Sequence, residues 1–519
     1  MPTMTVQAFI TSETQPSTRG FLRSIDFHVA KPSRVFTILV TAIATRLVSF
    51  GNPIVYTDEE FYFAVGRAMV NGALPFVDIW DRKPIGLFLI YAGPAALPGT
   101  TGIWLYQLLA LASAAGTAIV IARLADVAGW NRGGTFAGVA YLVWITIAGG
   151  QGGQSPVLYN LLMALAAFFV VSGNPQSRRR GAFTMLLVGL AMQIKYTVIP
   201  EGIYFGLTLM LAEWRRARRA SAVLIWGATL VMIALLPTIA VMGVYADRGA
   251  LSAFVFANFE SIFGRNPDPA REQFINLVKA TAILLPLLGM AVGARTIGRE
   301  KHNSARFFLS GWLLAALLAF AMIPPWPDHY TLPVILPGAV MAAGLLSRPH
   351  ARRAGIWLIL VAAVVGQASL LLDLQRRGTP GQFAAVAQSI GAGRGCLYVY
   401  SSSSMLYPAT GRCAVSSYVF PSHLTREREN GSIGVDQMTE LRAIFARAPE
   451  IVVMGPPYDG ERRDIRREAL RLIGSNYVFS AEMPLGRKRI GIYRRSKIPF
   501  AVGGVTDFGA PQTPIRRTS

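Results

Sequence analysis

Charged side chains are scarce in this chain of 519 residues. Aspartate, glutamate, lysine and arginine together make up 15% of it, whereas 52% of the residues are hydrophobic and the mean hydropathy is +0.41. Soluble globular proteins average roughly 25% charged residues. The apolar residues also fall into blocks long enough to cross a hydrocarbon core of about 30 Å. The sequence therefore predicts an integral membrane protein and argues against a large soluble one.

Acidic residues are scarcer than basic ones. The chain has 28 aspartates and glutamates against 50 lysines and arginines, which gives a net charge of +22. A nucleic-acid-binding protein can carry such an excess. Here, however, the basic residues cluster in the C-terminal third and between apolar blocks, as at residues 178–180, 215–219 and 348–353. Membrane proteins fix their orientation in this way, so we predict no nucleic-acid partner.

Cysteine is almost absent, since Cys396 and Cys413 are the only two in the sequence. Both lie in the C-terminal third. An oxidising compartment would permit a disulfide between them. Two unpaired, partly buried thiols are the alternative, and the sequence does not decide between the two. A small-residue cleavage site is also lacking after the first apolar run, which we therefore interpret as an uncleaved signal anchor.

The apolar blocks predict about eleven membrane-spanning helices. We place them at residues 35–51, 103–122, 133–149, 157–172, 181–194, 198–212, 221–245, 274–292, 307–323, 331–346 and 355–372. Lysine and arginine are much more frequent in one alternate set of connections than in the other. The positive-inside rule then places the N-terminus in the cytoplasm and everything after residue 373 outside.

The same pattern divides the chain into four parts. Residues 1–33 are polar and predicted to be a disordered cytoplasmic segment, and residues 34–373 form the transmembrane domain. Residues 374–498 alternate short β-prone runs with helical stretches, which predicts a small α/β domain outside the membrane. Residues 499–519 are rich in glycine, proline and threonine and are predicted to be a flexible tail. No internal repeat is apparent.

The outside connection of residues 52–102 is long, and long loops in compact proteins often carry function. It begins with three carboxylates, Asp58, Glu59 and Glu60, where the chain leaves the first span. A structural interpretation exists: Thr57 and Glu60 have the spacing of a capping box, and carboxylates stabilise the positive end of a helix. The apolar stripe that follows predicts a helix lying along the membrane surface.

The second half of this connection adds cations. The segment Asp81-Arg82-Lys83-Pro84 precedes an apolar stretch, and proline suits the first position of a helix. Arg82 and Lys83 would then stand beside a helix N-terminus, which favours phosphate. A carboxylate and a cationic phosphate site together suit a transfer reaction on a lipid phosphate, because the cations hold the leaving group while the carboxylate deprotonates the attacking hydroxyl. The alternative is that both cations only extend to lipid headgroups.

The order of these motifs resembles that of bacterial GT-C glycosyltransferases of the protein O-mannosyltransferase-like group, which includes lipid A aminoarabinose transferases and rhizobial galacturonosyltransferases. The resemblance covers roughly residues 35–425. It rests on Asp58-Glu59, residues 72–78 and 80–84, Gly189-Leu190-Ala191 with Lys195, Asp328-His329-Tyr330 followed by Pro333 and Pro337, and residues 407–412 and 416–421.

The resemblance implies a GT-C-like fold of about eleven transmembrane helices with interfacial helices and a periplasmic α/β domain. It also implies an inverting transfer of a single sugar from a polyprenyl-phosphate donor. The acceptor would be lipid A, core oligosaccharide or another cell-envelope glycan on the periplasmic side. The chain would lie in the bacterial inner membrane, so its partners would be the lipid-linked donor, the glycan or glycolipid acceptor and the bilayer.

By resemblance, Asp58 is the catalytic carboxylate with Glu59 beside it, and Lys83 binds the donor phosphate together with Arg82. Phe61 stands where some relatives carry a phosphate-binding arginine. Gln154 stands where many relatives carry an acidic residue, and it cannot supply negative charge to a divalent metal. We therefore predict chemistry without a metal or other cofactor.

Further candidate site residues are Gln154, Lys195, His329 and Tyr330, all on the predicted outer side. A lysine at the end of a span often extends to headgroups, and an interfacial histidine is often only a polar surface residue. A transporter or flippase of a lipid-linked or anionic substrate is the alternative function. It should carry ionisable or helix-breaking residues near the bilayer midplane, often in two related halves. A non-catalytic scaffold is a third possibility, in which the loss of Asp58 would leave activity intact.

Overall fold

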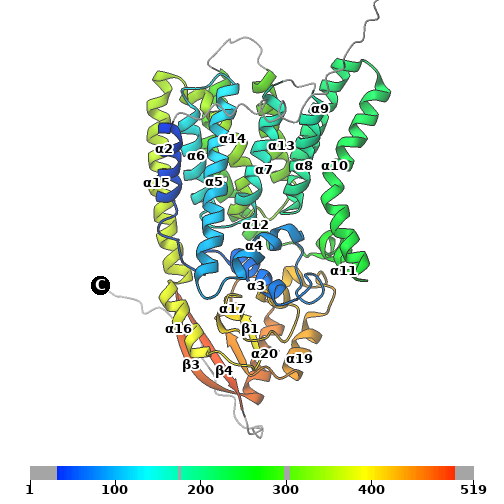
Figure 1. Ribbon diagram of the computed structural model, residues 1–519. Coiled ribbons are helices and arrows are strands. Elements are labelled where there is room, and N and C mark those ends of the chain that lie inside the picture. The colour runs from blue at the N-terminus through cyan, green and yellow to red at the C-terminus, as the bar shows by residue number, and fades with distance from the viewer. Residues whose placement is uncertain (1–31, 174–176, 297–303, 497–519) are drawn as a thin grey trace, which may run out of the picture.

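The computed structural model describes residues 32–173, 177–296 and 304–496. Its helices run side by side in a bundle, and a smaller domain of helices and strands caps one end of that bundle (Figure 1). The predictions of disorder for residues 1–31 and of a flexible tail at residues 499–519 lie outside the described residues. The prediction of an α-helical polytopic membrane protein with a small α/β domain is confirmed.

Each predicted span overlaps one helix of the bundle. These helices are α2 (Pro32–Ala44), α5 (Thr101–Val127), α6 (Gly134–Ile147), α7 (Ser155–Val171), α8 (Arg178–Met192), α9 (Ile199–Ala217), α10 (Ala220–Asp247), α12 (Ala270–Thr296), α13 (Ser304–Ala321), α14 (Leu332–Leu346) and α15 (Pro349–Arg377). Among the described residues, six helical segments are long and apolar enough to cross a membrane: α5, α10, α12, α13, α14 together with the preceding η4 (Asp328–Thr331), and α15 together with the following α16 (Pro380–Ile390). The other five helices of the bundle, α2, α6, α7, α8 and α9, are too short or too polar to cross a membrane by length and composition alone.

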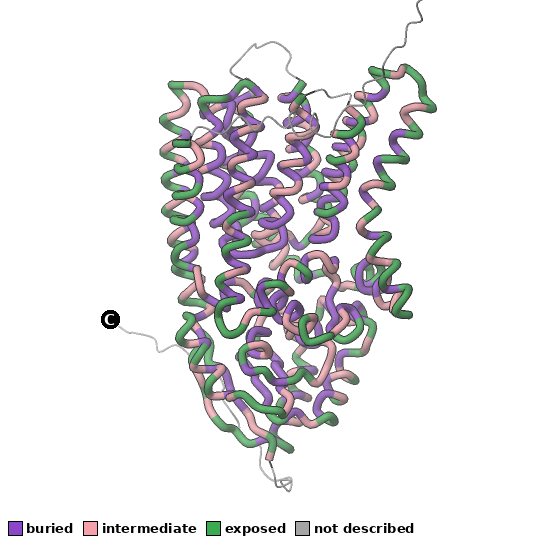
Figure 2. The backbone as a smooth tube through the Cα atoms, in the orientation of Figure 1, coloured by how far each residue is buried: buried purple, intermediate pink, exposed green. Residues whose placement is uncertain are grey.

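The inner helices of the bundle are buried, whereas its outer helices expose large aliphatic residues. Helix α14 packs against α12 and α6 and is almost entirely buried. The outer helices α10 and α15 instead show exposed surface along their length (Figure 2). Ile225 on α10 and Val364 on α15 are 69% and 70% exposed. A soluble protein rarely presents so much apolar surface, so these faces contact lipid.

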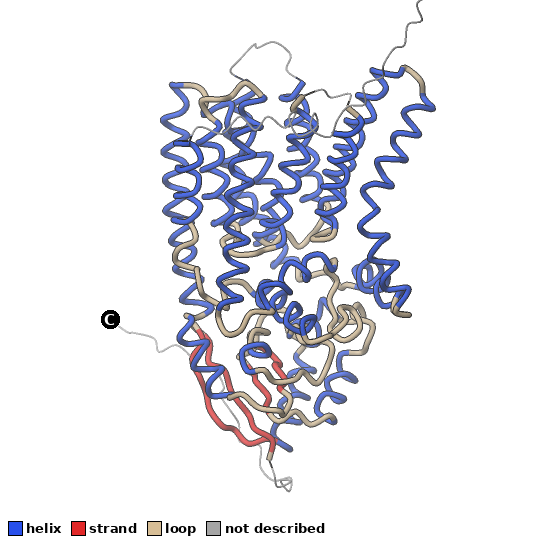
Figure 3. The backbone as a smooth tube through the Cα atoms, viewed as in Figure 1, coloured by secondary structure: helices blue, strands red, loops and turns tan. Residues whose placement is uncertain are grey.

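Short helices fill the space between the bundle and the C-terminal domain (Figure 3). They are α3 (Thr57–Val70), α4 (Ile85–Ala95), α11 (Leu251–Val255), η2 (Phe256–Glu260) and η3 (Ser261–Gly264). A helix begins at this point of the chain, but the predicted capping box is wrong, because Tyr56 is the N-cap residue and no side chain caps the helix. Eight residues of α3 are buried, since it packs against α4 and contacts α17 (Leu406–Thr410) of the C-terminal domain.

The C-terminal domain contains a mixed four-stranded sheet in the order β1-β2-β4-β3. Strands β1 and β2 are parallel, whereas β4 runs antiparallel to both β2 and β3. Its elements are α16 (Pro380–Ile390), β1 (Leu397–Ser401), α17 (Leu406–Thr410), α18 (Pro421–Thr425), η5 (Glu427–Glu429), α19 (Gln437–Ala446), β2 (Ile451–Met454), α20 (Arg463–Asn476), β3 (Tyr477–Leu485) and β4 (Lys488–Arg495).

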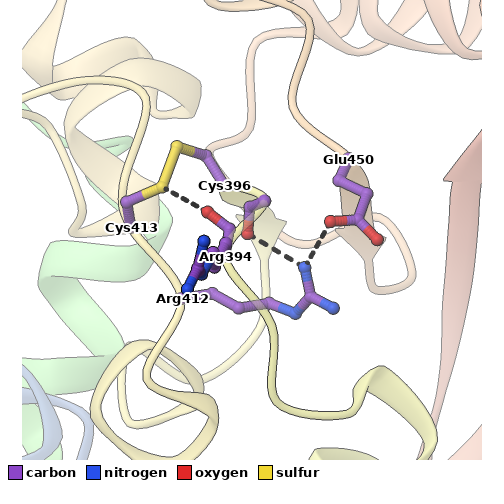
Figure 4. The surroundings of a disulfide bond; sticks show 6 residues. Arg394, Cys396, Arg412, Cys413 and Glu450 are labelled. Atoms are coloured by element: carbon purple, nitrogen blue, oxygen red, sulfur yellow. Dashed lines mark hydrogen bonds and ion pairs between the residues drawn. A yellow bond between two sulfur atoms is a disulfide. The ribbon is translucent and has the colours of Figure 1, made fainter.

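Cys396 and Cys413 form a disulfide in this domain (Figure 4). It joins the start of β1 to the loop after α17. The neighbouring Arg412 donates hydrogen bonds to the carbonyl oxygen of Gly395, at 2.9 Å, and to the Glu450 carboxylate, at 2.8 Å. Of the two alternatives that the sequence left open, the structure therefore adopts the covalent one.

Candidate active site

Asp58 lies in the first turn of α3, at the end of the bundle that faces the C-terminal domain (Figure 1). Its side chain is 22% exposed. The Asp58 Oδ2 atom accepts a hydrogen bond from Nε2 of Gln154 at 3.2 Å and lies 3.9 Å from Nε2 of His329. Gln154 is the fully buried N-cap residue of α7, which follows a glycine-rich turn at residues 149–153. Three segments far apart in the sequence therefore meet at one carboxylate.

Two lysines add positive charge beside Asp58. Lys83 lies just before α4, with its Nζ atom 3.4 Å from Oδ2 of Asp81 and 5.1 Å from the centre of the Tyr62 ring. Lys195 lies just after α8, with its Nζ atom 4.6 Å from the centre of the Tyr330 ring. Aromatic faces attract cations, so each ring helps to hold its ammonium group in place.

The electrostatics of these groups favour an ionised carboxylate. Burial acts to raise the pKa of Asp58, but Lys83, His329, the Gln154 hydrogen bond and Lys195 outweigh it, and the pKa lies below its usual value. Burial acts to lower the pKa of Lys83, but Asp81 and Asp58 outweigh it, and the pKa is raised. Burial lowers the pKa of Lys195 to about 8. At neutral pH the site thus holds a carboxylate base beside a charged lysine.

His329 connects Asp58 to a second carboxylate. Its Nδ1 atom lies 2.7 Å from the hydroxyl oxygen of Tyr56 and 3.5 Å from Oδ1 of Asp328. Asp328 and His329 belong to η4 (Asp328–Thr331), directly before α14. The Tyr56 hydroxyl donates to Oδ1 of Asp328 at 3.2 Å. These contacts fix the ring so that Nε2 faces Asp58.

Glu59 lies apart from these groups, although it is the next residue in the chain. Its side chain is 1% exposed and packs against Gly152, where an added Cβ would come within 2.1 Å of Oε2. Only glycine leaves room for this carboxyl group. Burial raises the pKa of Glu59 to about 8. The pKa of Glu59 thus lies well above that of Asp58, and its carboxyl group faces the glycine-rich turn between α6 and α7.

Arg82 also faces away from Asp58. Its guanidinium forms an ion pair with Glu429 of η5 and donates to the carbonyl oxygen of Ser432 at 3.0 Å and to the hydroxyl of Ser261 at 3.1 Å. Arg265 pairs with the same carboxylate. Arg82 thus ties the 52–102 connection to the C-terminal domain, and of the two predicted donor-phosphate residues only Lys83 stands with Asp58.

Two residues near the site carried no signal in the sequence. His423 of α18 is buried, with Nε2 3.8 Å from Oδ1 of Asp81, and burial lowers its pKa to about 3. Arg377, at the end of α15, donates to the Thr57 hydroxyl at 2.8 Å and lies 4.8 Å from the centre of the Tyr56 ring. Both lie more than 300 positions from the residues that they contact, so neither local pattern nor spacing could have found them.

A pocket opens beside this cluster. Three segments line it: the connection between α8 and α9, the η4–α14 region, and α13 with the residues that follow it. The lining residues are Lys195, Thr197, His329, Tyr330, Pro333, Ala316, Ala319, Phe320 and Ile323. This pocket is small, about 20 Å³ in volume, and places the Lys195 ammonium group next to apolar side chains. In the part of the chain that the structure describes, no group of three or more histidine, cysteine, aspartate or glutamate residues is placed to hold a metal ion.

The fold and the residues around Asp58 define a polytopic membrane protein. Its cluster of ionisable residues lies at the end of the helical bundle that faces the α/β domain. Two solved structures share the fold. One is ArnT from Cupriavidus metallidurans bound to undecaprenyl phosphate, with a TM-score of 0.60 and 15% identity over 92% of this chain and 98% of that chain. The other is ArnT from the same organism in the apo state, with a TM-score of 0.55 and 14% identity over 88% and 97% of the respective chains.

ArnT is a lipid A aminoarabinose transferase of the GT-C glycosyltransferases, so the fold that the resemblance implied is the fold observed. At 14–15% sequence identity, the structural similarity to ArnT establishes the fold alone. No known sequence family and no curated protein matches the chain.

Proposed function

We propose that this chain is a membrane glycosyltransferase that moves a single sugar from a polyprenyl-phosphate donor to an acceptor at the outer face of the bacterial inner membrane, with inversion. The observation that carries this proposal is the ionised Asp58 beside Lys83 and Lys195 at one end of the bundle. The shared fold with a protein bound to undecaprenyl phosphate supports the class of donor.

In the proposed reaction Asp58 is the general base. It takes the proton of the acceptor hydroxyl while the acceptor oxygen bonds to the anomeric carbon, on the face opposite the phosphate. The bond between that carbon and the phosphate oxygen breaks, and its electron pair stays on the polyprenyl phosphate. Lys83 and Lys195 stabilise the negative charge that develops on this leaving group. A single displacement of this kind inverts the anomeric centre, and none of its steps requires a metal.

The neighbouring residues set the geometry of that step. Gln154 donates a hydrogen bond to Oδ2 of Asp58 at 3.2 Å, and Nε2 of His329 lies 3.9 Å from the same oxygen. The phosphate end of the donor would lie at the mouth of the pocket beside Lys195, with the lipid tail against α13. The positive-inside prediction supports an outward-facing site, and lipid A, core oligosaccharide or another envelope glycan is then the accessible acceptor.

The decisive experiment measures sugar transfer by the full-length protein in nanodiscs. Polyprenyl-phosphate sugars and envelope extract are supplied, and products are followed by mass spectrometry. Loss of a general base typically costs about 10²–10⁴ in rate, so we expect that loss for Asp58→Asn. Lys83→Ala should raise the donor KM and lower kcat, because the lysine contacts the phosphate before and during the transfer.

Matched controls are Asp247→Asn and Arg248→Ala, which remove exposed charges at the end of α10. They should transfer sugar at the parental rate. If Asp58→Asn and Lys83→Ala also do so while retaining the parental melting temperature, the site assignment is wrong. If the parent consumes no donor, the glycosyltransferase proposal is wrong, and substrate flux in liposomes then tests the transporter alternative.

A further inference from the structure

A polar cavity of about 340 Å³ lies between helix ends on the side of the bundle away from the C-terminal domain. The ends of α5 and α14 on that side can be followed in Figure 1. Four segments line it: the connection between α5 and α6, and the adjacent ends of α12, α13 and α14. The lining residues are Gly129, Trp130, Asn131, Arg132, Ala294, Arg306, Gly344, Ser347 and Arg348. Among these described residues three are arginines and none is acidic.

The walls of this cavity are held in place by close backbone packing. An added Cβ on Gly133 would come within 2.1 Å of the carbonyl oxygen of Ala343, and one on Gly344 within 2.6 Å of the Cβ of Ala294. The Ser347 hydroxyl donates to the carbonyl oxygen of Trp130 at 2.9 Å. The connection between α5 and α6 is therefore fixed against the end of α14, which gives the cavity a defined floor.

The arginines have a structural role that must be weighed first. Arg306 donates from Nε to the carbonyl oxygen of Ala128 at 2.7 Å, and its guanidinium lies 5.2 Å from the centre of the Trp130 ring. Arg348 donates from Nη2 to the carbonyl oxygen of Ala294 at 3.2 Å. Basic side chains commonly bond the last carbonyls of helices in this way. Capping alone would explain why arginines stand here.

Helix capping does not account for every guanidinium nitrogen in the cavity. Nη1 of Arg348 is buried and has no hydrogen-bond acceptor among the described residues. Arg132 is exposed at the rim and caps no helix through its side chain in the described structure. A buried guanidinium nitrogen without an acceptor is unfavourable, so an anion that enters the cavity would gain that hydrogen bond and the attraction of the neighbouring guanidiniums.

We propose that this cavity binds a phosphate group, with Arg132 and Arg348 as ligands. Arginine binds phosphate through paired, charge-assisted hydrogen bonds, and the volume falls within the roughly 300–1,000 Å³ of small-molecule sites. Two sources of phosphate can reach this end of the bundle: the headgroup of an anionic phospholipid in the adjacent leaflet, and free inorganic phosphate. The site is independent of Asp58, so the proposal does not rest on the function proposed above.

The test is native mass spectrometry of the full-length protein in detergent. Phosphatidylglycerol is titrated against the parent, Arg132→Gln and Arg348→Gln, and each is compared with Arg353→Gln, which removes an exposed charge from α15 outside the cavity. Loss of one charge-assisted contact should weaken binding roughly tenfold in each cavity variant and leave the Arg353→Gln value unchanged. Arg132→Gln removes no helix cap, so its effect cannot come from misfolding of α12 or α14.

A second arm separates the two sources. Inorganic phosphate at millimolar concentration is added before the lipid, and zwitterionic phosphatidylcholine replaces phosphatidylglycerol in a parallel titration. Displacement of phosphatidylglycerol by phosphate identifies a free-phosphate site, whereas retention of the lipid identifies a headgroup site. The proposal is overturned if both cavity variants bind phosphatidylglycerol as the parent does, if Arg353→Gln loses as much, or if phosphatidylcholine binds equally well to parent and variants.

Discussion

Gln154 controls the charge of Asp58 in the proposed reaction, so its removal should shift the pH dependence of sugar transfer. Nε2 of Gln154 donates to Oδ2 of Asp58 at 3.2 Å, and its side chain is fully buried. Gln154→Leu deletes that donor and retains a similar volume. The change acts on the ionised form of Asp58 only, because a protonated carboxyl group gains much less from an added donor.

The size of the shift follows from this one contact. A hydrogen bond to a charged group contributes about 1.5–3 kcal/mol, which corresponds to about one to two pKa units. Asp58 is 22% exposed, so water can replace part of the lost bond and the lower end of that range applies. Lys83, His329 and Lys195 still face the carboxylate and hold its pKa down. We therefore expect a rise of about one unit.

The sign of the effect is fixed by the direction of the pKa shift. The pKa of Asp58 lies below its usual value in the parent, so the base is ionised through the neutral range. Gln154→Leu raises that pKa, and the acid limb of kcat/KM moves to higher pH by about one unit. Transfer falls roughly tenfold below the new pKa and approaches the parental rate above it.

Gln154→Glu extends the series. It places a second carboxyl group against Asp58, and two carboxylates in contact cannot both ionise readily. The acid limb should therefore move further than in Gln154→Leu. Gln151→Leu is the matched control, because Gln151 is also buried in the same loop but makes no hydrogen bond to Asp58. Its pH profile should match the parent.

The assay is the pH dependence of kcat/KM for sugar transfer by each variant, with the melting temperature recorded alongside. If transfer by Gln154→Leu falls equally at every pH and the acid limb stays in place, Gln154 only fills space. If Gln154→Glu moves the limb to lower pH, the assignment of Asp58 as the ionising base is refuted.

Two further predictions concern the attachment of the C-terminal domain. Arg82→Met should lower the stability by about 2–3 kcal/mol, because Glu429 is left buried with Arg265 as its remaining strong partner, and loss of both would cost more. A thermal melt checks this, and an unchanged melt with a raised donor KM would show that Arg82 acts on the substrate instead. The double change Cys396→Ser and Cys413→Ser should cost about 3 kcal/mol, as expected for a closed loop of this length. The parental melting temperature should then fall on reduction while the double variant does not respond, and a parent insensitive to reductant would contradict the prediction.

The membrane-spanning segments could be predicted from the sequence because they depend on local properties. Hydropathy and length belong to each segment alone, so the eleven predicted segments each fall on a helix. The number of helices that can cross the membrane alone could not be predicted in the same way. Helices α8 and α9, for example, are not candidate spans by themselves and pack against neighbouring helices of the bundle. The disulfide was undecided for a similar reason, because sequence distance does not determine how near two cysteines come in space.

The sequence by itself determined the membrane class, the α/β domain and the pairing of Asp58 with a lysine of the same connection. The sequence could not decide which of two adjacent candidate residues lies in the site. Consecutive helical residues point about 100° apart, so Asp58 faces the lysines while Glu59 faces Gly152 in the turn between α6 and α7. Likewise Lys83 stands with Asp58, whereas Arg82 turns to Glu429. Only the tertiary structure decided which groups each side chain contacts, because these partners come from segments far away in the chain.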